Sequence, residues 1–485
     1  MRQLATLLLL LTCVGCSLLP QPNVLIVTPT PQDSGPTAIS TLAPQVRPTD
    51  TRAPITLGPA VGADYTIEPT ATPRFTAGPP TETVPPRPST FTPGPSWTPI
   101  PTRPTTSPTP DPLAGPPTLT ATPIPQLDSS RMGIQLASNM GRVEWDASLT
   151  RAKELGVKWI KVQVDWNFLQ PNGYDPGEDR LNTFLINIET ADQFGFKILF
   201  SVAKAPNWAR STNESSGPPN DPQELGNFLT LLLQTKMGPI VDAIEVWNEP
   251  NLKIDWVTDQ YPFTGAGYMR LFGPAYGAIR GYRSDIIIVT AGLAPTGNSD
   301  GTRNDREYLQ EMYDAGLGRY QDIVIGVHPY GWANPPDARC CDPSAARGWD
   351  DQPQFFFLDT LEDTRAILNR NGHGSVPMWV TEFGWTSWDD LGVGIPDPQA
   401  DNLWMTENSP IEQANYAIRA FEIGLSRPDV GVMFLWNLNY ANPFTLANRD
   451  EIAGYSLLVM ADDYVQYTKA RPLFYMLPQA ARSQP

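Results

Sequence analysis

Two stretches share one pattern: AIEVWNEPN at residues 243–251 and MWVTEFGW at residues 378–385. Each begins with a short, largely apolar run rich in β-branched residues and reaches a glutamate, Glu249 or Glu382, where the run ends. Runs of this length and composition predict buried strands. We therefore expect the two carboxylates at the ends of two strands.

Strand-like runs alternate with helix-like segments from residue 132 to the end of the chain. The predicted strands are residues 133–136, 158–164, 197–202, 243–247, 286–291, 323–327, 378–381 and 432–436. The predicted helices are residues 146–155, 181–194, 222–235, 267–282, 305–315, 356–369, 410–425 and 471–481. Because parallel strands need crossovers, eight such units predict an α/β fold, the (β/α)8 TIM barrel. No Gly-x-Gly-x-x-Gly turn follows the first strand, which argues against a dinucleotide-binding fold.

Composition divides the chain. Residues 20–127 contain 28 of the 53 prolines and 23 threonines, without apolar periodicity. Such a segment cannot bury enough surface to offset its ordering entropy, so it predicts a disordered, extended Pro/Thr-rich linker. A barrel of this class takes about 250 residues, which the rest of the chain can supply. The predicted parts are residues 1–16, 17–127 and 128–485.

Residues 1–16 have the organisation of an export signal. Arg2 supplies a positive charge, residues 7–11 an apolar core, and Val14-Gly15-Cys16 a small-residue junction before a cysteine. This resembles a bacterial lipoprotein signal, which implies lipidation at Cys16 and an extracytoplasmic, membrane-anchored location. Cys13 stands where that family prefers leucine, so an ordinary secretory signal is the alternative. No later run reaches about 20 apolar residues, so the anchor is the only predicted membrane contact.

Charge and cysteine content limit the partners. The net charge of −17 arises from 45 acidic and 28 basic residues in 128–485, and no basic run suggests nucleic acid. The acidity is explained by solubility or, alternatively, by selection of substrates. Cys340 and Cys341 are adjacent, so we expect a vicinal disulfide or two unpaired thiols. No second Cys or His cluster accompanies them, so no metal site is predicted.

Polar and aromatic residues gather at the predicted strand ends, where the active sites of such barrels lie. The candidates by position are Lys204, Trp208, Asn248, Glu249, His328, Tyr330, Glu382 and Trp436. Each alone has a structural explanation, such as a solvated loop carboxylate or a packed ring. Five strand ends of this kind together are hard to explain by packing. Glu245 shares the parity of Glu249, so we expect a buried, paired structural carboxylate there.

These segments resemble clan A glycoside hydrolases, the barrel group that includes cellulase-like and β-xylosidase-like enzymes. In that clan an Asn-Glu pair closes the fourth strand and a second Glu closes the seventh. Asn248-Glu249 and Glu382 match this pattern, and the resemblance covers most of residues 131–485. It implies that Glu249 is the general acid/base and that Glu382 is the nucleophile.

The resemblance also implies binding roles. Asn248 would hold the sugar 2-hydroxyl, and Tyr330 would donate a hydrogen bond to the nucleophile. His328 would line the subsite of cleavage, and Trp436 would lie beneath the sugar ring. Further candidates for stacking on a sugar are Trp208, Trp332, Trp385, Trp388 and Trp404.

One position departs from the family pattern. Several clan members carry an arginine on an early strand, where it orients the nucleophile. Residues 161–166 read KVQVDW and contain no arginine. Lys204 or Arg131 is a candidate replacement.

The sequence thus predicts a retaining glycosidase that acts by double displacement on a β-linked glycan or glycoside. A retaining pair needs its carboxyl groups about 5–5.5 Å apart, with Glu382 ionised and Glu249 carrying the proton. The predicted partner is an oligo- or polysaccharide, and no cofactor is required. A catalytically inactive carbohydrate-binding surface lipoprotein on the same barrel is the alternative, and a surface scaffold for protein contact is another. The sugar, the linkage, endo or exo action and the oligomeric state stay open.

Overall fold

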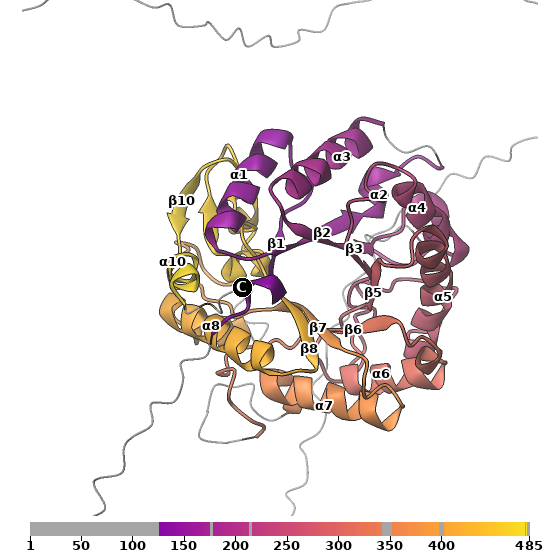
Figure 1. Cartoon of the computed structure of the whole chain (residues 1–485). Helices are drawn as coiled ribbons and strands as arrows, with labels where there is room; N and C mark the ends of the chain where they lie inside the picture. Colours follow the sequence, from indigo (N-terminus) through magenta and orange to yellow (C-terminus); the bar gives the residue numbers. More distant parts are fainter. Residues whose placement is uncertain are drawn as a thin grey trace, which may run out of the picture. The chain divides into compact units, whose positions relative to one another are not determined.

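Eight parallel strands close into a barrel in the order β1 to β8, as the alternation in the sequence predicts (Figure 1). The strands are β1 (Met132–Leu136), β2 (Trp159–Asp165), β3 (Lys197–Ala203), β4 (Ala243–Val246), β5 (Ile287–Thr290), β6 (Ile323–Val327), β7 (Met378–Phe383) and β8 (Val430–Leu435). This computed structural model describes residues 126–174, 178–212, 216–341, 352–396, 402–480 and 482. The predicted signal, Cys16 and the predicted linker up to residue 125 lie outside the described residues.

Helices surround the barrel. The longer ones are α1 (Arg142–Glu154), α3 (Glu178–Gln193), α4 (Gln223–Leu233), α5 (Gly265–Tyr282), α6 (Asp305–Asp314), α7 (Phe357–Arg370), α8 (Pro410–Ser426) and α10 (Pro472–Gln479). All the predicted strands and helices are present, with ends displaced by at most four residues. Besides short 3-10 helices, four α-helices and strands of the described residues were not predicted, because they are too short to show a period: α2 (Trp166–Leu169), α9 (Pro443–Ala447), β9 (Leu458–Met460) and β10 (Tyr467–Ala470).

The lower part of the barrel is filled by large rings. Trp159 and Trp379 pack edge to face with ring centroids 5.1 Å apart, and Phe434 lies against both. Gly431 leaves the necessary space, since a Cβ there would lie 2.2 Å from the indole nitrogen of Trp379. This apolar cluster fills that part of the interior, and the sites of such barrels lie at the opposite, C-terminal ends of the strands.

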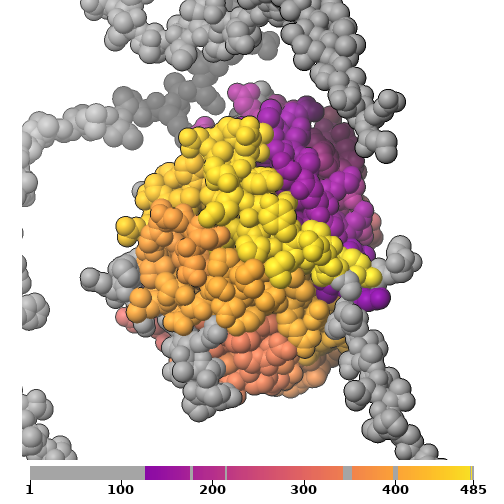
Figure 2. All heavy atoms as spheres, turned by 90° about the vertical axis from the view of Figure 1, so that its left-hand side faces the viewer, coloured from indigo at the N-terminus to yellow at the C-terminus, as the bar shows by residue number. Residues whose placement is uncertain are grey.

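The C-terminal segments cover one side of the barrel. Figure 2 shows the yellow surface of the last elements beside the orange α8 and the indigo α1. β9 and β10 pair antiparallel, and α10 packs on α8. Leu127 and Arg482 form an isolated bridge, so the start of the barrel domain lies next to its end.

Two further predictions concern the described residues. Cys340 and Cys341 form a disulfide in the loop between β6 and α7, where the Cys340 amide donates to Asp359 Oδ2 at 2.6 Å. Within the described ranges, none of the helices combines the length and the apolar character that a bilayer crossing requires.

Candidate active site

A pocket of about 550 Å³ opens at the C-terminal ends of the strands. Six residues that the sequence predicted as site residues line it: Lys204, Asn248, Glu249, Tyr330, Glu382 and Trp436. They come from segments that follow or end β3, β4, β6, β7 and β8. The barrel therefore brings together side chains that are up to 232 positions apart in the sequence.

The turn after β4 presents Asn248 and Glu249. Trp247 and Glu249 adopt left-handed φ angles of 74° and 42°, which are unfavourable for residues with a Cβ. Two contacts hold this backbone: Trp247 Nε1 donates to the Asp255 carbonyl oxygen at 3.2 Å, and the Glu249 amide donates to the Gly292 carbonyl oxygen at 3.1 Å. The strained turn thus fixes both side chains at the pocket.

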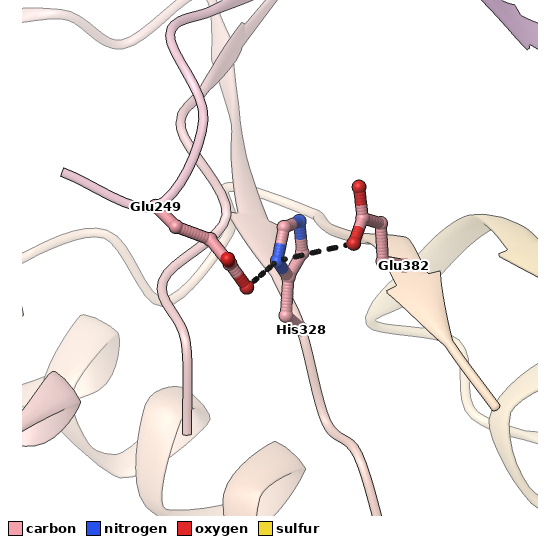
Figure 3. Close-up of side chains that lie close together, drawn as sticks. All are labelled: Glu249, His328 and Glu382. Carbon is pink, nitrogen blue, oxygen red and sulfur yellow. Dashed lines mark hydrogen bonds and ion pairs between the residues drawn. The ribbon is translucent and has the colours of Figure 1, made fainter. Parts of the chain in front are cut away.

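Glu249 and Glu382 meet across His328 (Figure 3). His328 Nδ1 lies 2.9 Å from Glu249 Oε1 and 3.8 Å from Glu382 Oε2. The facing atoms of the three residues all lie within 4.8 Å of one another. This spacing is compatible with the short separation of carboxyl groups that a retaining glycosidase requires.

His328 lies below the pocket instead of in its wall. Its side chain is fully buried, and it is not among the residues that line the pocket. Gly292, at the end of β5, makes room for it, since a Cβ there would lie 2.2 Å from the imidazole ring. The prediction that His328 lines the subsite is therefore corrected: it holds the two carboxylates from beneath.

Lys161 is the cation that contacts Glu382. Its fully buried Nζ lies 2.8 Å from Glu382 Oε1 and 2.9 Å from Glu245 Oε2. Burial acts to lower the pKa of Lys161, but Glu245 and Glu382 outweigh it and raise that pKa. Burial acts to raise the pKa of Glu245, but Lys161 and His328 hold it below its usual range. The expectation of a buried, paired Glu245 is confirmed.

The proposed replacements for the missing arginine were wrong. Arg131 lies at the start of β1 and donates to backbone carbonyls of residues 425, 427, 430 and 431. Lys204 pairs with Asp165 at 3.6 Å. Lys161 could have been predicted from the sequence, because residues 161, 163 and 165 alternate with apolar residues on β2 and so face the same side of the strand.

Tyr330 completes the surroundings of Glu382. Its hydroxyl donates to Glu382 Oε2 at 2.9 Å. Burial and the charge of Glu382 raise the pKa of Tyr330 well above its usual range, so the phenol keeps its proton. The register between β7 and β8 shifts between Val380 and Phe383, and such an irregularity re-aims a side chain. Both oxygens of Glu382 therefore accept hydrogen bonds from fixed donors.

The carboxylates around His328 favour its protonated form. Burial acts to lower its pKa, but Glu382, Glu245 and Glu249 outweigh burial and raise it to about 9. A protonated imidazole donates from Nδ1 to Glu249 and offers no lone pair to a metal. Glu249, His328 and Glu382 are also close enough to one another to surround a cation.

The raised pKa of His328 predicts a dependence of stability on pH. Its stabilising effect is fully present below the unfolded value of about 6.5 and is lost as pH rises through about 9. We expect the free energy of unfolding, measured by chemical denaturation, to fall by up to about 3 kcal/mol between these limits. His328→Gln should show a smaller decrease, to which Asp255, with its pKa raised to about 7, still contributes. An equal decrease in that variant would contradict the assignment.

The aromatic candidates divide into two groups. Trp436 and Trp332 line the pocket, and the ring of Tyr455 lies 4.9 Å from that of Trp436. Trp208 packs against Trp166 and Tyr174, and its Nε1 donates to the Gln170 carbonyl oxygen, so it is not part of the pocket lining. Three further rings are buried in packing: Trp385, Trp388 and Trp404.

Several lining residues were missed in the sequence. Gln135 on β1 and Gln163 on β2 reach the pocket from one side. Asp255 reaches it from a loop, and Glu451 from the start of a short 3-10 helix, η7 (Glu451–Tyr455). Burial and the charge of Glu249 raise the pKa of Asp255 to about 7, so this carboxyl titrates near neutral pH. The two glutamines were detectable as polar residues near the ends of strands, whereas Asp255 and Glu451 lie outside the strands and carry no such signal.

Comparison with known proteins gives matches at the level of structure. No protein-family model matches the sequence, and no curated protein matches it. A family 39 glycoside hydrolase from the gut symbiont Bacteroides cellulosilyticus WH2 is similar, with 18% identity and a TM-score of 0.52 over 73% of this chain. The chain spans 64% of the length of that protein.

Two other solved structures have TM-scores comparable to that of the family 39 enzyme. The Ignisphaera aggregans GH53 catalytic domain has 15% identity and a TM-score of 0.51, over 75% of this chain and 99% of that one. A GH5_18 from Bifidobacterium longum subsp. infantis has 11% identity and a TM-score of 0.50, over 73% of this chain and 80% of that one. These likenesses show that the chain shares its barrel fold with these three proteins.

Proposed function

We propose that this chain is a retaining glycoside hydrolase that cleaves a β-linked glycan or glycoside. Glu249 would act as general acid/base and Glu382 as nucleophile. The observation that carries the proposal is the convergence of these two carboxylates at one pocket, with facing atoms within 4.8 Å. The names of the similar structures, a family 39 glycoside hydrolase, a GH53 catalytic domain and a GH5_18, support it.

The partners of the two carboxylates differ in a way that suits two roles. Glu382 accepts from the Lys161 ammonium and from the Tyr330 hydroxyl, and these donors fix the position of the carboxylate that would attack carbon. Glu249 Oε1 faces the His328 imidazolium, so the transferable proton is expected on Oε2. One carboxylate thus has a donor on each oxygen, and the other is placed to give and take a proton.

The reaction would proceed in two displacements. Glu382 attacks the anomeric carbon while Glu249 protonates the departing oxygen, which leaves a covalent glycosyl-enzyme. Glu249 then removes a proton from water, and the water oxygen displaces Glu382 from the same carbon. Asn248 Oδ1 is a buried acceptor without a hydrogen-bond partner among the described residues, and it suits a sugar hydroxyl.

Removal of the acid/base provides a direct test. We expect Glu249→Ala to lower kcat by about 10²–10⁴-fold on aryl glycosides with poor leaving groups, and by much less on activated ones. Azide should restore part of the rate on activated glycosides, because an anionic nucleophile needs no general base. The product should be a glycosyl azide that retains the β configuration, identified by NMR.

Two outcomes would overturn the assignment. Equal losses for good and poor leaving groups would show that Glu249 does not protonate the departing oxygen. Binding of glycans by the native chain without hydrolysis of any glycoside would favour the inactive carbohydrate-binding alternative. Glu224→Gln, which removes a carboxylate from α4 outside the pocket, is the matched control.

A further inference from the structure

A second hollow of about 310 Å³ lies beside the first pocket. The two share Gln163 and Lys204 in their walls, so they are adjacent compartments of one site. The second is bounded by residues that follow β1, β3 and β8, by Gln163 and Asp165 on β2, and by Tyr464 from the loop between β9 and β10.

The wall of the second hollow combines amides with aromatic rings. Asn139 contributes an amide, and Tyr440 and Tyr464 contribute rings. Asn442 also lines the wall, but its amide caps α9 and donates to the Tyr440 carbonyl oxygen. The ring centroids of Trp436 and Tyr440 are 6.2 Å apart, so aromatic surface continues from the first pocket into the second. Sugars present apolar C–H faces and peripheral hydroxyls, and this mixture of rings and amides suits them.

Gln135 presents a free hydrogen-bond acceptor in the first pocket, next to Tyr440 of the second hollow. It is 4% exposed and lines the first pocket, and its Nε2 donates to the Tyr440 hydroxyl at 3.0 Å. Its Oε1 has no hydrogen-bond partner among the described residues. A buried acceptor without a partner costs free energy, so a ligand hydroxyl placed there is favourable.

The position in the barrel fixes which part of a glycan the second hollow would meet. Glu249 follows β4, which lies opposite β8 in a closed barrel of eight sequential strands. The leaving group must lie on the side of the acid that protonates it. The second hollow, over β8, β1 and β2, therefore lies on the other side, toward the sugar that Glu382 would attack.

The charge of the second hollow is balanced. Lys204 Nζ lies 3.6 Å from Asp165 Oδ2, so the cation and the carboxylate of this wall offset each other. An uncharged sugar is thus a better match than a uronic acid, which would need an unpaired cation.

We infer that the second hollow is a subsite for one more uncharged sugar on the glycone side. The substrate is then an oligo- or polysaccharide with at least two sugar residues on that side of the scissile bond. The inference rests on the proposed function, because it needs the glycosidic bond to be cleaved at Glu249 and Glu382.

The test compares aryl glycosides that differ by one sugar. The probes are 4-nitrophenyl β-glucoside, β-xyloside, β-mannoside and β-galactoside, and the β-1,4-linked disaccharide glycosides of the same sugars. We expect kcat/KM for the best disaccharide glycoside to exceed that of its monosaccharide counterpart at least about tenfold, or by about 1.4 kcal/mol. Release of the intact disaccharide, checked by chromatography, confirms cleavage at the aryl bond.

Asn139→Trp should fill the second hollow and bring this ratio close to one. Asn139 is exposed, so the larger side chain does not disturb the core. Asn227→Trp, the same change on the exposed face of α4, should leave the ratio at its native value. Circular dichroism and the melting temperature verify that both variants are folded.

The outcomes separate the two proposals. If monosaccharide glycosides are cleaved as well as disaccharide ones, and Asn139→Trp does not change the ratio, the subsite is refuted and the glycosidase stands. If no glycoside is hydrolysed, the proposed function fails and the subsite fails with it. A raised ratio that survives in Asn139→Trp would also overturn the subsite, since the extra sugar must then bind elsewhere.

Discussion

Glu382→Gln is expected to abolish turnover and to leave the barrel folded. The amide has nearly the shape of the carboxylate but cannot form a glycosyl ester, so the first displacement is lost. Loss of a nucleophile lowers kcat by on the order of 10⁴-fold or more. Initial rates on an activated aryl glycoside at high enzyme concentration measure the residual activity.

The fold should survive this change because Lys161 keeps a partner. Its Nζ lies 2.9 Å from Glu245 as well as 2.8 Å from Glu382, so the buried ammonium still faces one carboxylate. The Tyr330 hydroxyl can donate to the amide oxygen of the variant. We therefore expect nearly native circular dichroism and a melting temperature within a few degrees of the native value. An unfolded variant would leave the kinetic result without meaning.

A trapping experiment distinguishes a nucleophile from a residue that only supports the site. A 2-deoxy-2-fluoro glycoside with a good leaving group should inactivate the native chain and add one sugar to the peptide that carries Glu382. Glu382→Gln should not be labelled. Glu154→Gln, an exposed change on α1, is the matched control and should be labelled normally. Labelling of any other carboxylate would transfer the role of nucleophile to that residue.

The sequence predicted the barrel well because its signals are local and repeated. Strands such as residues 197–203 are compact apolar runs, and helices such as α4 have a one-sided apolar face, so neither needs tertiary information. The strand ends were also readable, since glutamates follow apolar runs at Glu249 and Glu382. The predicted signal and linker lie outside the described residues and remain predictions.

The electrostatic core of the site was not predicted, because it depends on partners from distant strands. Lys161 on β2 forms ion pairs with Glu245 from β4 and Glu382 from β7, and no pattern in the neighbouring sequence predicts these pairs. A lysine at an inward position of a barrel strand would have allowed us to predict a carboxylate partner, since a buried ammonium needs a carboxylate nearby. His328 was expected in the pocket wall, but room beside Gly292 lets it sit beneath both catalytic candidates.

Lys161→Met is expected to destabilise the barrel by about 3–5 kcal/mol, because removal of one partner leaves a buried charge uncompensated. Glu245 is fully buried, and after the change its nearest remaining cation is His328, at 3.8 Å. A domain of this kind is stable by about 5–15 kcal/mol in all, so the loss is large. Chemical denaturation should show the midpoint at a much lower denaturant concentration.

A double substitution tests whether the uncompensated buried charge of Glu245 causes the loss of stability. Lys161→Met with Glu245→Gln removes the ammonium and the carboxylate together, so it should recover at least half of the lost free energy. Lys236→Met removes an exposed lysine whose ion pair with Glu189 is open to solvent, and it should cost less than about 1 kcal/mol. Lys161 would not hold the two carboxylates in place if Lys161→Met were as stable as the native chain. The same would follow if the double variant were no more stable than Lys161→Met alone.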